Sequence, residues 1–377
     1  MNLKSKIYLL LFSHVLFILC SCDVQVTQYN TDEEIEHLMR EHDLPSISAC
    51  VIKDNTVVWQ CAYGYSNREN QIKATHETIY HIGSISKVFI ATAFMQLEES
   101  GIVDINQDIN EYLPIEIRNP NFPNNPITAK MLLLHNSSLA STRTDADAPG
   151  IWEEFQEDQA PPLREWVPQF IIPSGKYFNS RIWKPYEPNH FQLYSNIGSC
   201  VLAYLVEHLT GQDFREYCKE HIFEPLAMQN TSYNYYDLKT NKIAALYRYD
   251  NTVHPNFDYR LHSSGGVKTT ASDLARFLMA YLNGGELDGK RILAESTVDK
   301  ILTVQNSTSG ICFLWNASLG GWFGHIGTLE AGAATIAEIH PQSKTAFIIF
   351  CNKQSPIVYH GHEIYGLVKQ RANEYIK

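Results

Sequence analysis

The chain has 377 residues, of which 41 are acidic and 30 are basic, and its formal net charge is −11 at pH 7. So acidic a chain offers no basic face for phosphates, and we expect no nucleic-acid partner. Its length exceeds what one hydrophobic core usually fills, which indicates one large domain with an insertion, or two lobes.

The first 21 residues have the pattern of a secretory signal peptide. Two lysines precede an apolar run over residues 7–20, which is too short to span a bilayer. The run ends in Leu19-Cys20-Ser21-Cys22, which resembles the bacterial lipoprotein box and predicts Cys22 as the lipidated first residue of the mature chain. Ordinary cleavage near this point without a lipid is the alternative. We therefore expect an exported protein, periplasmic or on the cell envelope, that meets a membrane only through this anchor.

Six further cysteines are widely spaced along the chain. The spacing fits neither a disulfide framework nor a zinc or redox pattern, so we expect mostly buried free thiols. These are Cys50, Cys61, Cys200, Cys218, Cys312 and Cys351. Neither H-E-x-x-H nor a paired C-x-x-C occurs, and the sequence predicts no metal and no cofactor.

The first predicted elements are a helix over residues 33–42 and a hairpin of two β-branched strands, 47–52 and 57–63. Next comes Ser84-Ile85-Ser86-Lys87 at the start of a buried helix that runs to Leu97 and stops at Gly101. Residues three apart on a helix lie on one face, so the lysine would lie beside the Ser84 hydroxyl.

An amine beside Ser84 can accept its proton and make the hydroxyl a nucleophile. A helix N-terminus would also stabilise the oxyanion of an attacked carbonyl. The alternative is an ordinary N-cap serine followed by a solvated Lys87. A lysine in the first turn opposes the helix dipole, which favours the catalytic interpretation.

The middle of the chain is rich in Pro, Asn, Tyr and Trp. Residues 127–136 predict a short capped helix, and the aromatic segment 145–189 either walls a binding cleft or packs on its own lobe. Tyr194-Ser195-Asn196 then opens a helix that stops at Gly211. The Tyr194 phenol could shuttle a proton if the Lys87 ammonium depresses its pKa, and the Asn196 amide could bond to the substrate.

The last third predicts a capped amphipathic helix over 270–278, which ends near Gly284, and a helical tail after Lys353. Between them lie four strand-like runs, 310–315, 320–325, 334–339 and 345–351. One of these runs leads into His325-Ile326-Gly327-Thr328, which could form a second wall of a site.

Three motifs therefore follow one another: Ser84-x-x-Lys87, Tyr194-x-Asn196 and His325-x-Gly327. In this order and spacing they resemble the serine β-lactamase and penicillin-binding-protein superfamily. The match is to the branch of class C β-lactamases, D-alanyl-D-alanine carboxypeptidases, D-aminopeptidases and related esterases. Residues 127–139 and 265–277 resemble flanking segments of that branch, and the likeness runs from about residue 32 to 370.

The resemblance implies an α+β, β-lactamase/transpeptidase-like fold with an antiparallel sheet flanked by helices. Residues 32–105 and 261–377 would form the α/β domain, with an all-helical domain inserted over 106–260; a tether over 22–31 would precede them.

The resemblance also implies a role for each site residue. Ser84 would be the acylated nucleophile, and Lys87 its first base or the group that tunes the base. Tyr194 would be the general base, and which of these two takes the first proton stays open. Asn196 and His325 would contact the substrate. In the strand Gly327-Thr328, the Thr328 N–H would complete an oxyanion hole with the N–H of the serine.

Two departures from the family pattern matter. True β-lactamases carry Lys-Thr-Gly where this chain has His325-Ile326-Gly327. A histidine is mostly neutral at pH 7, which disfavours tight binding of a penicillin-like carboxylate. In addition, Asn136-Ser137-Ser138 replaces the usual Thr-Ser-Gly turn.

We therefore predict a serine hydrolase that forms an acyl-enzyme with an ester or a D-amino-acid-containing amide, such as a peptidoglycan-like peptide. A β-lactamase is one alternative. A binding protein that kept the fold but lost turnover, a sensor or scaffold, is the other.

Overall fold

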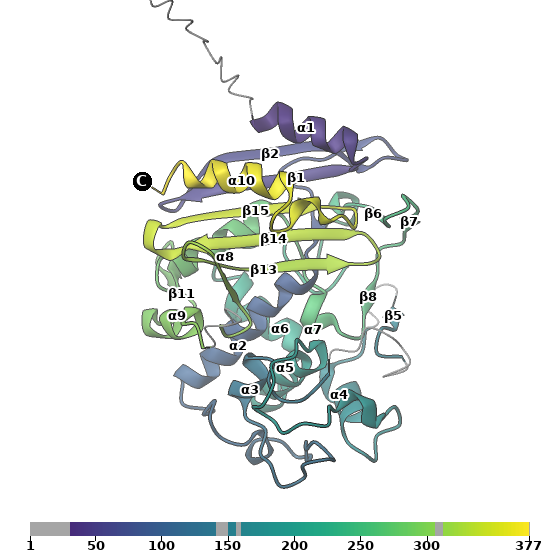
Figure 1. Ribbon diagram of the computed structural model, residues 1–377, viewed down its shortest axis with the longest axis vertical. Coiled ribbons are helices and arrows are strands. Elements are labelled where there is room, and N and C mark those ends of the chain that lie inside the picture. Colours follow the sequence, from purple (N-terminus) through teal and green to yellow (C-terminus); the bar gives the residue numbers. More distant parts are fainter. Residues whose placement is uncertain (1–30, 141–149, 156–159, 306–311, 377) are drawn as a thin grey trace, which may run out of the picture.

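Figure 1 shows the computed structural model, which describes residues 31–140, 150–155, 160–305 and 312–376. The predicted signal peptide and Cys22 lie outside these ranges. Within the described part of the chain, no helix has both the length and the apolar character that a membrane crossing needs.

The centre of the molecule is a seven-stranded antiparallel sheet in the order β12-β13-β14-β15-β1-β2-β3. The N-terminal hairpin therefore joins the C-terminal strands through the pairing of β1 with β15. This confirms the predicted antiparallel sheet. The strands are β1 Ser46–Lys53, β2 Thr56–Asn67, β3 Ile72–Lys73, β12 Asn316–Ser318, β13 Trp322–Leu329, β14 Ala333–His340 and β15 Thr345–Cys351.

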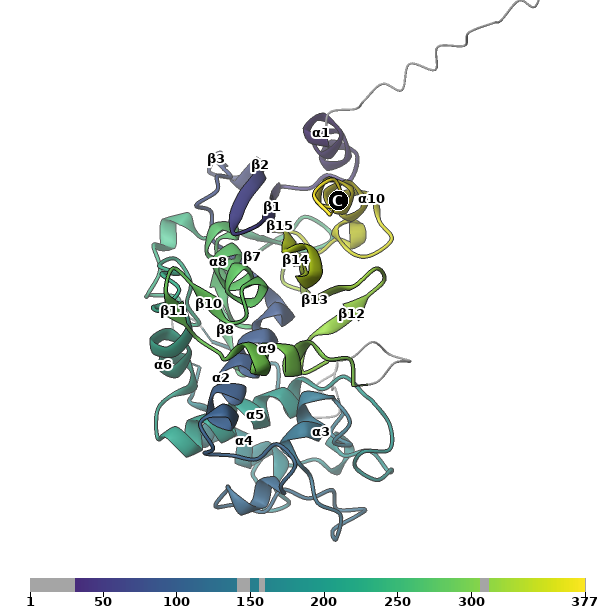
Figure 2. The same cartoon turned by 90° about the vertical axis from the view of Figure 1, so that its left-hand side faces the viewer.

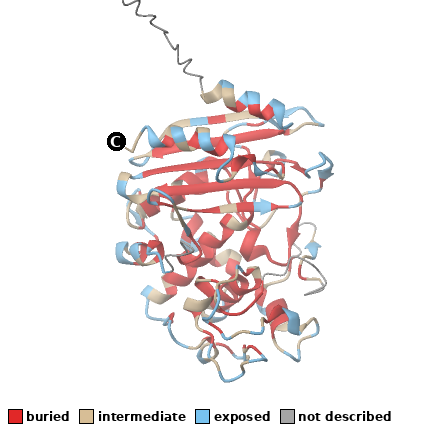
Figure 3. Ribbon diagram, in the orientation of Figure 1, coloured by how far each residue is buried: buried red, intermediate tan, exposed pale blue. Residues whose placement is uncertain are grey.

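Helices cover both faces of this sheet, as Figure 2 shows. On one face lie α1 (Thr31–Glu41) and α10 (Glu363–Asn373), and on the other lie α2 (Lys87–Glu99) and α8 (Ala271–Leu282). Alternate residues of a strand point to opposite faces, so both sets of side chains in β1 and β15 are buried. The central strands are accordingly buried along their length (Figure 3).

The region between α2 and α8 is mostly helix and irregular chain, and it packs against α2 through α5. It also contains two-residue strands, so the predicted insertion is not purely helical. The helices are α3 Ala129–Leu133, α4 Leu163–Ile171, α5 Asn196–Thr210, α6 Phe214–Cys218 with a π-turn Lys219–Phe223, and α7 His262–Gly265. The short strands are β5 Glu154–Phe155, β6 Leu246–Tyr247, β7 Val253–His254 and β8 Asp258–Tyr259.

Other short elements frame this region. Strand β4 pairs with β9, and β10 pairs with β11 ahead of helix α9. They are β4 Tyr80–His81, β9 Lys268–Thr269, β10 Glu286–Leu287, β11 Lys290–Arg291 and α9 Glu295–Leu302. The domain boundaries at residues 105 and 260 remain a prediction.

Several local predictions are confirmed and one is wrong. The six cysteines are buried free thiols, and Thr128 caps α3 by accepting from the Met131 N–H at 3.2 Å. The strand predicted over 310–315 is wrong for its described part, because Cys312–Trp315 is irregular and the strand there starts at Asn316. Residue Leu314 has a positive φ of 54°, which an extended strand does not allow.

Candidate active site

Ser84 lies in a 3-10 turn, Gly83–Ser86, that leads directly into α2. The predicted helix therefore begins one turn later than expected, at Lys87. The Ser86 hydroxyl fastens the turn: it donates to the Gly83 carbonyl at 2.7 Å and accepts from the Val267 N–H at 3.1 Å. The nucleophile candidate is thus held by main-chain contacts on both sides.

Lys87 is completely buried, and its Nζ lies 3.1 Å from the Ser84 Oγ, as the three-residue spacing predicted. Nζ also donates to the carbonyl of Ser264, in α7, at 2.7 Å. Neither partner is a carboxylate, so the charged form loses its hydration without receiving a counter-ion. Burial lowers the pKa of Lys87 to about 7, and Cys200 opposes part of that shift.

Tyr194 and Asn196 come from the start of α5, which Ser195 caps by accepting from the Gly198 N–H at 2.9 Å. The Lys87 Nζ lies 4.9 Å from the centroid of the Tyr194 ring. The structure thus brings the first two motifs together. Asn196 is half-buried at the first residue of α5.

The lowered pKa that Tyr194 would need to shuttle a proton is not found, and Lys87 is not among the groups that shift it. Burial raises the pKa of the Tyr194 phenol above its usual value, and a contact with Ser84 opposes part of the rise. The residue keeps 37% of its surface exposed, and solvent at that edge limits the shift. The amine rather than the phenol is therefore the group that changes protonation near neutral pH.

His325 lies on β13, and its ring is 6.2 Å from the Tyr194 ring, so the third motif faces the second. Its Nδ1 lies 2.6 Å from the carbonyl of Ile326. Burial and then the Lys87 charge lower the pKa of His325 to about 3. As predicted, this position supplies no cation at pH 7. The next side chain, Ile326, points to the other face of the sheet and packs there in the core beneath α1 and α10.

Gly327 lets β13 approach the turn that carries Ser84. A Cβ on Gly327 would lie 1.9 Å from the Ile82 carbonyl oxygen, and one on Gly83 would lie 2.8 Å from the Thr328 nitrogen. Gly83 also has a positive φ of 51°. Glycine at both positions thus brings the Thr328 N–H beside the Ser84 turn, where two N–H groups could receive one oxyanion.

Two residues beside the site were missed by the sequence analysis. The buried His135 ring lies 4.6 Å from the Tyr194 ring, and its Nδ1 accepts from the Ser195 N–H at 3.2 Å. Tyr359 donates to the Gly327 carbonyl at 3.2 Å, and its hydroxyl also bonds to the Thr328 hydroxyl. Only the histidine lies in a flanking segment with a recognisable pattern; nothing marks the tyrosine among the 21 in the chain.

The altered turn after α3 keeps an unusual backbone shape. Ser138, which replaces the glycine of the family pattern, has a positive φ of 63°. Its hydroxyl accepts from the Asn119 side chain at 2.9 Å. This buried bond helps to offset the cost of a left-handed serine.

Comparison with protein families matches residues 31–370 to the Beta-lactamase family. The chain belongs to the Beta-lactamase family. Family membership agrees with the resemblance in the three motifs and with the antiparallel sheet between helices.

Within the described residues, no group of three or more His, Cys, Asp and Glu side chains could hold a metal ion.

Relatives of this Beta-lactamase family member are distant. Protein flp of Staphylococcus aureus (strain N315) is 24% identical over 93% of this chain and 70% of its own length. A class C β-lactamase structure has a TM-score of 0.71 at 19% identity and covers 92% of this chain and 94% of its own. The D-alanine carboxypeptidase AmpC from Burkholderia cenocepacia has a TM-score of 0.67 at 19% identity and covers 92% and 97%. These structures share the fold.

Proposed function

We propose that this protein is a serine hydrolase that forms an acyl-enzyme on Ser84 with an ester or a D-amino-acid-containing amide. The observation that supports it most is the buried Lys87 amine, which lies 3.1 Å from the Ser84 hydroxyl and has no carboxylate partner among the residues that the structure describes. A neutral amine at that distance can take the hydroxyl proton as the Oγ attacks a carbonyl carbon.

The remaining steps follow from the neighbouring groups. The oxyanion that forms on the carbonyl oxygen would accept from the N–H groups of Ser84 and Thr328. When the bond to the leaving group breaks, the Tyr194 phenol would give its proton to the departing oxygen or nitrogen and regain one from the Lys87 ammonium. A phenol with a raised pKa is protonated at neutral pH, which suits a donor. Water then releases the acyl group from the serine.

The substrate class follows from the wall formed by β13. His325 stands where β-lactamases carry a lysine, and it is neutral at pH 7. This wall therefore offers no positive charge to a carboxylate on the leaving group. Esters and amides without such a carboxylate fit it better than penicillins do. We therefore place esterase or D-aminopeptidase activity ahead of carboxypeptidase or β-lactamase activity.

A fluorophosphonate probe tests the nucleophile. The wild type should be labelled, and Ser84→Ala should not. Ser100→Ala, an exposed serine at the end of the same helix, is the matched control and should label as the wild type does. An unlabelled wild type would refute turnover and favour the binding-protein alternative. Parallel assays with p-nitrophenyl esters, D-alanyl amides and a chromogenic cephalosporin would then rank the substrates.

We also propose export and lipidation at Cys22, which rests on the sequence pattern of residues 1–22 alone. Cells fed a radiolabelled fatty acid should incorporate it into the wild type and not into Cys22→Ser. Equal incorporation would contradict the anchor, whereas a shortened but unlabelled wild type would indicate ordinary cleavage.

A further inference from the structure

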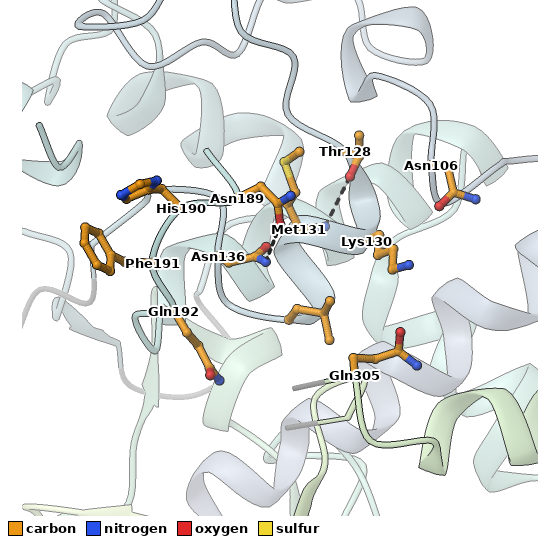
Figure 4. Close-up of a pocket in the computed structure, with 11 residues that line it drawn as sticks. Asn106, Thr128, Lys130, Met131, Asn136, Asn189, His190, Phe191, Gln192 and Gln305 are labelled. Atoms are coloured by element: carbon orange, nitrogen blue, oxygen red, sulfur yellow. Dashed lines mark hydrogen bonds between the residues drawn. The ribbon is translucent and has the colours of Figure 1, made fainter. Parts of the chain in front are cut away.

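A cavity of about 500 Å³ lies between α3, the segment 189–192 and the residues that follow α9 (Figure 4). None of the candidate site residues lines it, but two of its wall segments are chain neighbours of residues at the site. Gln192 in its wall precedes Tyr194 by two residues, and Asn136 in its wall follows His135 directly. The Leu193 N–H donates to the His135 carbonyl at 2.7 Å, which ties the two wall segments together.

Carboxamides are the commonest side chains in the lining of this cavity, which also includes one lysine and the apolar Met131, Leu134 and Phe191. The five carboxamides are Asn106, Asn136, Asn189, Gln192 and Gln305. None of the described residues that line it is acidic, although the chain has a net charge of −11. Carboxamides both donate and accept hydrogen bonds and carry no charge. This lining is therefore suited to a ligand whose groups also donate and accept, as hydroxyl and acetamido groups do.

Part of this hydrogen-bonding capacity is unused by the protein. The Asn136 Nδ2 donates to the Asn189 Oδ1 at 2.8 Å, which fixes both amides, while the Asn136 Oδ1 is buried without a partner in the described chain. In the described residues, no protein group hydrogen-bonds to the side chains of Lys130 or Gln192. Buried polar groups are normally satisfied, so the Asn136 Oδ1 favours a polar ligand, and the half-buried side chains of Lys130 and Gln192 are free to bond to it as well.

An aromatic ring stands at one end of the cavity. Figure 4 shows His190 and Phe191 at that end, with Lys130, Asn106 and Gln305 at the other. Phe191 is 56% exposed. Its ring packs perpendicular to the His190 ring, with 4.4 Å between the ring centroids and 89° between the planes. The Tyr186 ring also packs perpendicular to it, with 5.1 Å between the ring centroids and 82° between the planes. Both contacts are perpendicular, so they fix the Phe191 ring while more than half of its surface stays exposed beside a polar hollow.

We propose that this cavity is a carbohydrate-binding subsite that takes a short, uncharged oligosaccharide. A sugar ring has an apolar C–H face, which would stack on Phe191, and a rim of hydroxyl or acetamido groups, which would bond to the carboxamides. The volume is within the roughly 300–1,000 Å³ typical of small-molecule sites. A peptide fits less well, because peptide grooves usually offer a free strand edge, and neither helix α3 nor the segment 189–192 is a strand.

The position next to Tyr194 makes the cavity a subsite for the sugar part of a substrate whose acyl group reaches Ser84. That role rests on the proposed function, whereas sugar binding itself does not. Binding is therefore measured on Ser84→Ala, which cannot acylate, so a failure to bind says nothing about the labelling of the wild type.

Isothermal titration calorimetry with chitotetraose and with maltotetraose tests the proposal. At least one sugar should bind saturably, and the better one tells whether acetamido groups contribute. Phe191→Ala and Gln192→Ala, each added to Ser84→Ala, should weaken binding by at least about tenfold, or about 1.4 kcal/mol. Tyr249→Ala is the control, because that aromatic side chain is 72% exposed and lies outside the cavity.

Two results would overturn the proposal. One is that neither sugar binds saturably at millimolar concentration, or that binding is the same in Phe191→Ala as in its parent. The other is that a D-alanyl peptide binds instead and loses its affinity in Phe191→Ala, which would assign the cavity to peptide. Circular dichroism of each variant shows that a loss of binding is not a loss of fold.

Discussion

Two lysines of this protein are equally buried and have opposite surroundings. Lys87 and Lys268 both have 0% of their surface exposed. Lys268 is paired with the buried carboxylate of Asp258 and also donates to the carbonyls of Tyr233, at 2.9 Å, and Gly266, at 3.2 Å. Among the described residues, the hydrogen-bond partners of Lys87 are a hydroxyl and one carbonyl, and neither is a carboxylate.

The difference shows that the partner, rather than burial, decides what a buried lysine does. A carboxylate stabilises the ammonium and makes it a structural charge. Without one, burial favours the neutral amine, and the pKa of Lys87 falls to about 7. Lys268 thus joins two segments through an ion pair, whereas Lys87 can accept a proton.

The largest effect is expected for Lys87→Met. Activity should fall by a factor of about 10² to 10⁴, because the base is lost. Stability should rise, because the buried lysine releases a proton on folding that the unfolded chain keeps. With a folded pKa of about 7 and an unfolded one near 10.4, the wild type gains stability as pH rises between these values.

The advantage of Lys87→Met over the wild type should therefore be greatest below about pH 7 and smallest near pH 10. Urea unfolding at both pH values checks this. A variant less stable than the wild type below neutrality would show that the lysine contributes a favourable charge, as Lys268 does.

Lys268→Met should act on stability instead. It leaves the Asp258 carboxylate buried and unpaired, and we expect a loss of about 3–5 kcal/mol in the free energy of unfolding. Adding Asp258→Asn removes that charge and should restore a large part of the loss. If the single variant is as stable as the wild type, the two lysines do not differ in the way described.

A pH profile gives the next largest effect. Since the neutral amine is the active form, kcat/KM should rise with pH and level off above an apparent pKa of about 7. Cys200 lies close enough to Lys87 to affect its pKa, so Cys200→Asp would give Lys87 the kind of partner that Lys268 has. The rising limb should then move to higher pH, whereas Cys200→Ser, which only removes the effect of Cys200 itself, should move it slightly to lower pH.

The smallest effect is expected at Tyr359, which touches neither lysine. Tyr359→Phe removes the hydrogen bonds to Gly327 and Thr328, and we expect kcat to fall about five- to tenfold, the equivalent of about 1 kcal/mol. KM and the pH profile should stay unchanged, because proton transfer to Lys87 is not involved. A shifted profile would show that this residue acts on the lysine and not on the oxyanion donor.

The sequence by itself determined the elements and the site residues whose signals are local or ordered along the chain. β15 was predicted at its observed bounds, 345–351, because a continuous β-branched and aromatic run is a short-range signal. The spacing of Ser84 and Lys87 likewise predicted their contact, since three residues make nearly one helical turn. The order of the three motifs indicated the family.

Only the tertiary structure decided how these groups are tuned. The pKa of Lys87 depends on which atoms of α7 surround its amine, and the close approach of Thr328 to Ser84 depends on two glycines far apart in sequence. The role of Tyr359 and the cavity beside α3 could not be predicted from the sequence for the same reason. Desolvation, packing and hydrogen bonding act between segments that folding brings together, and spacing along the chain does not record them.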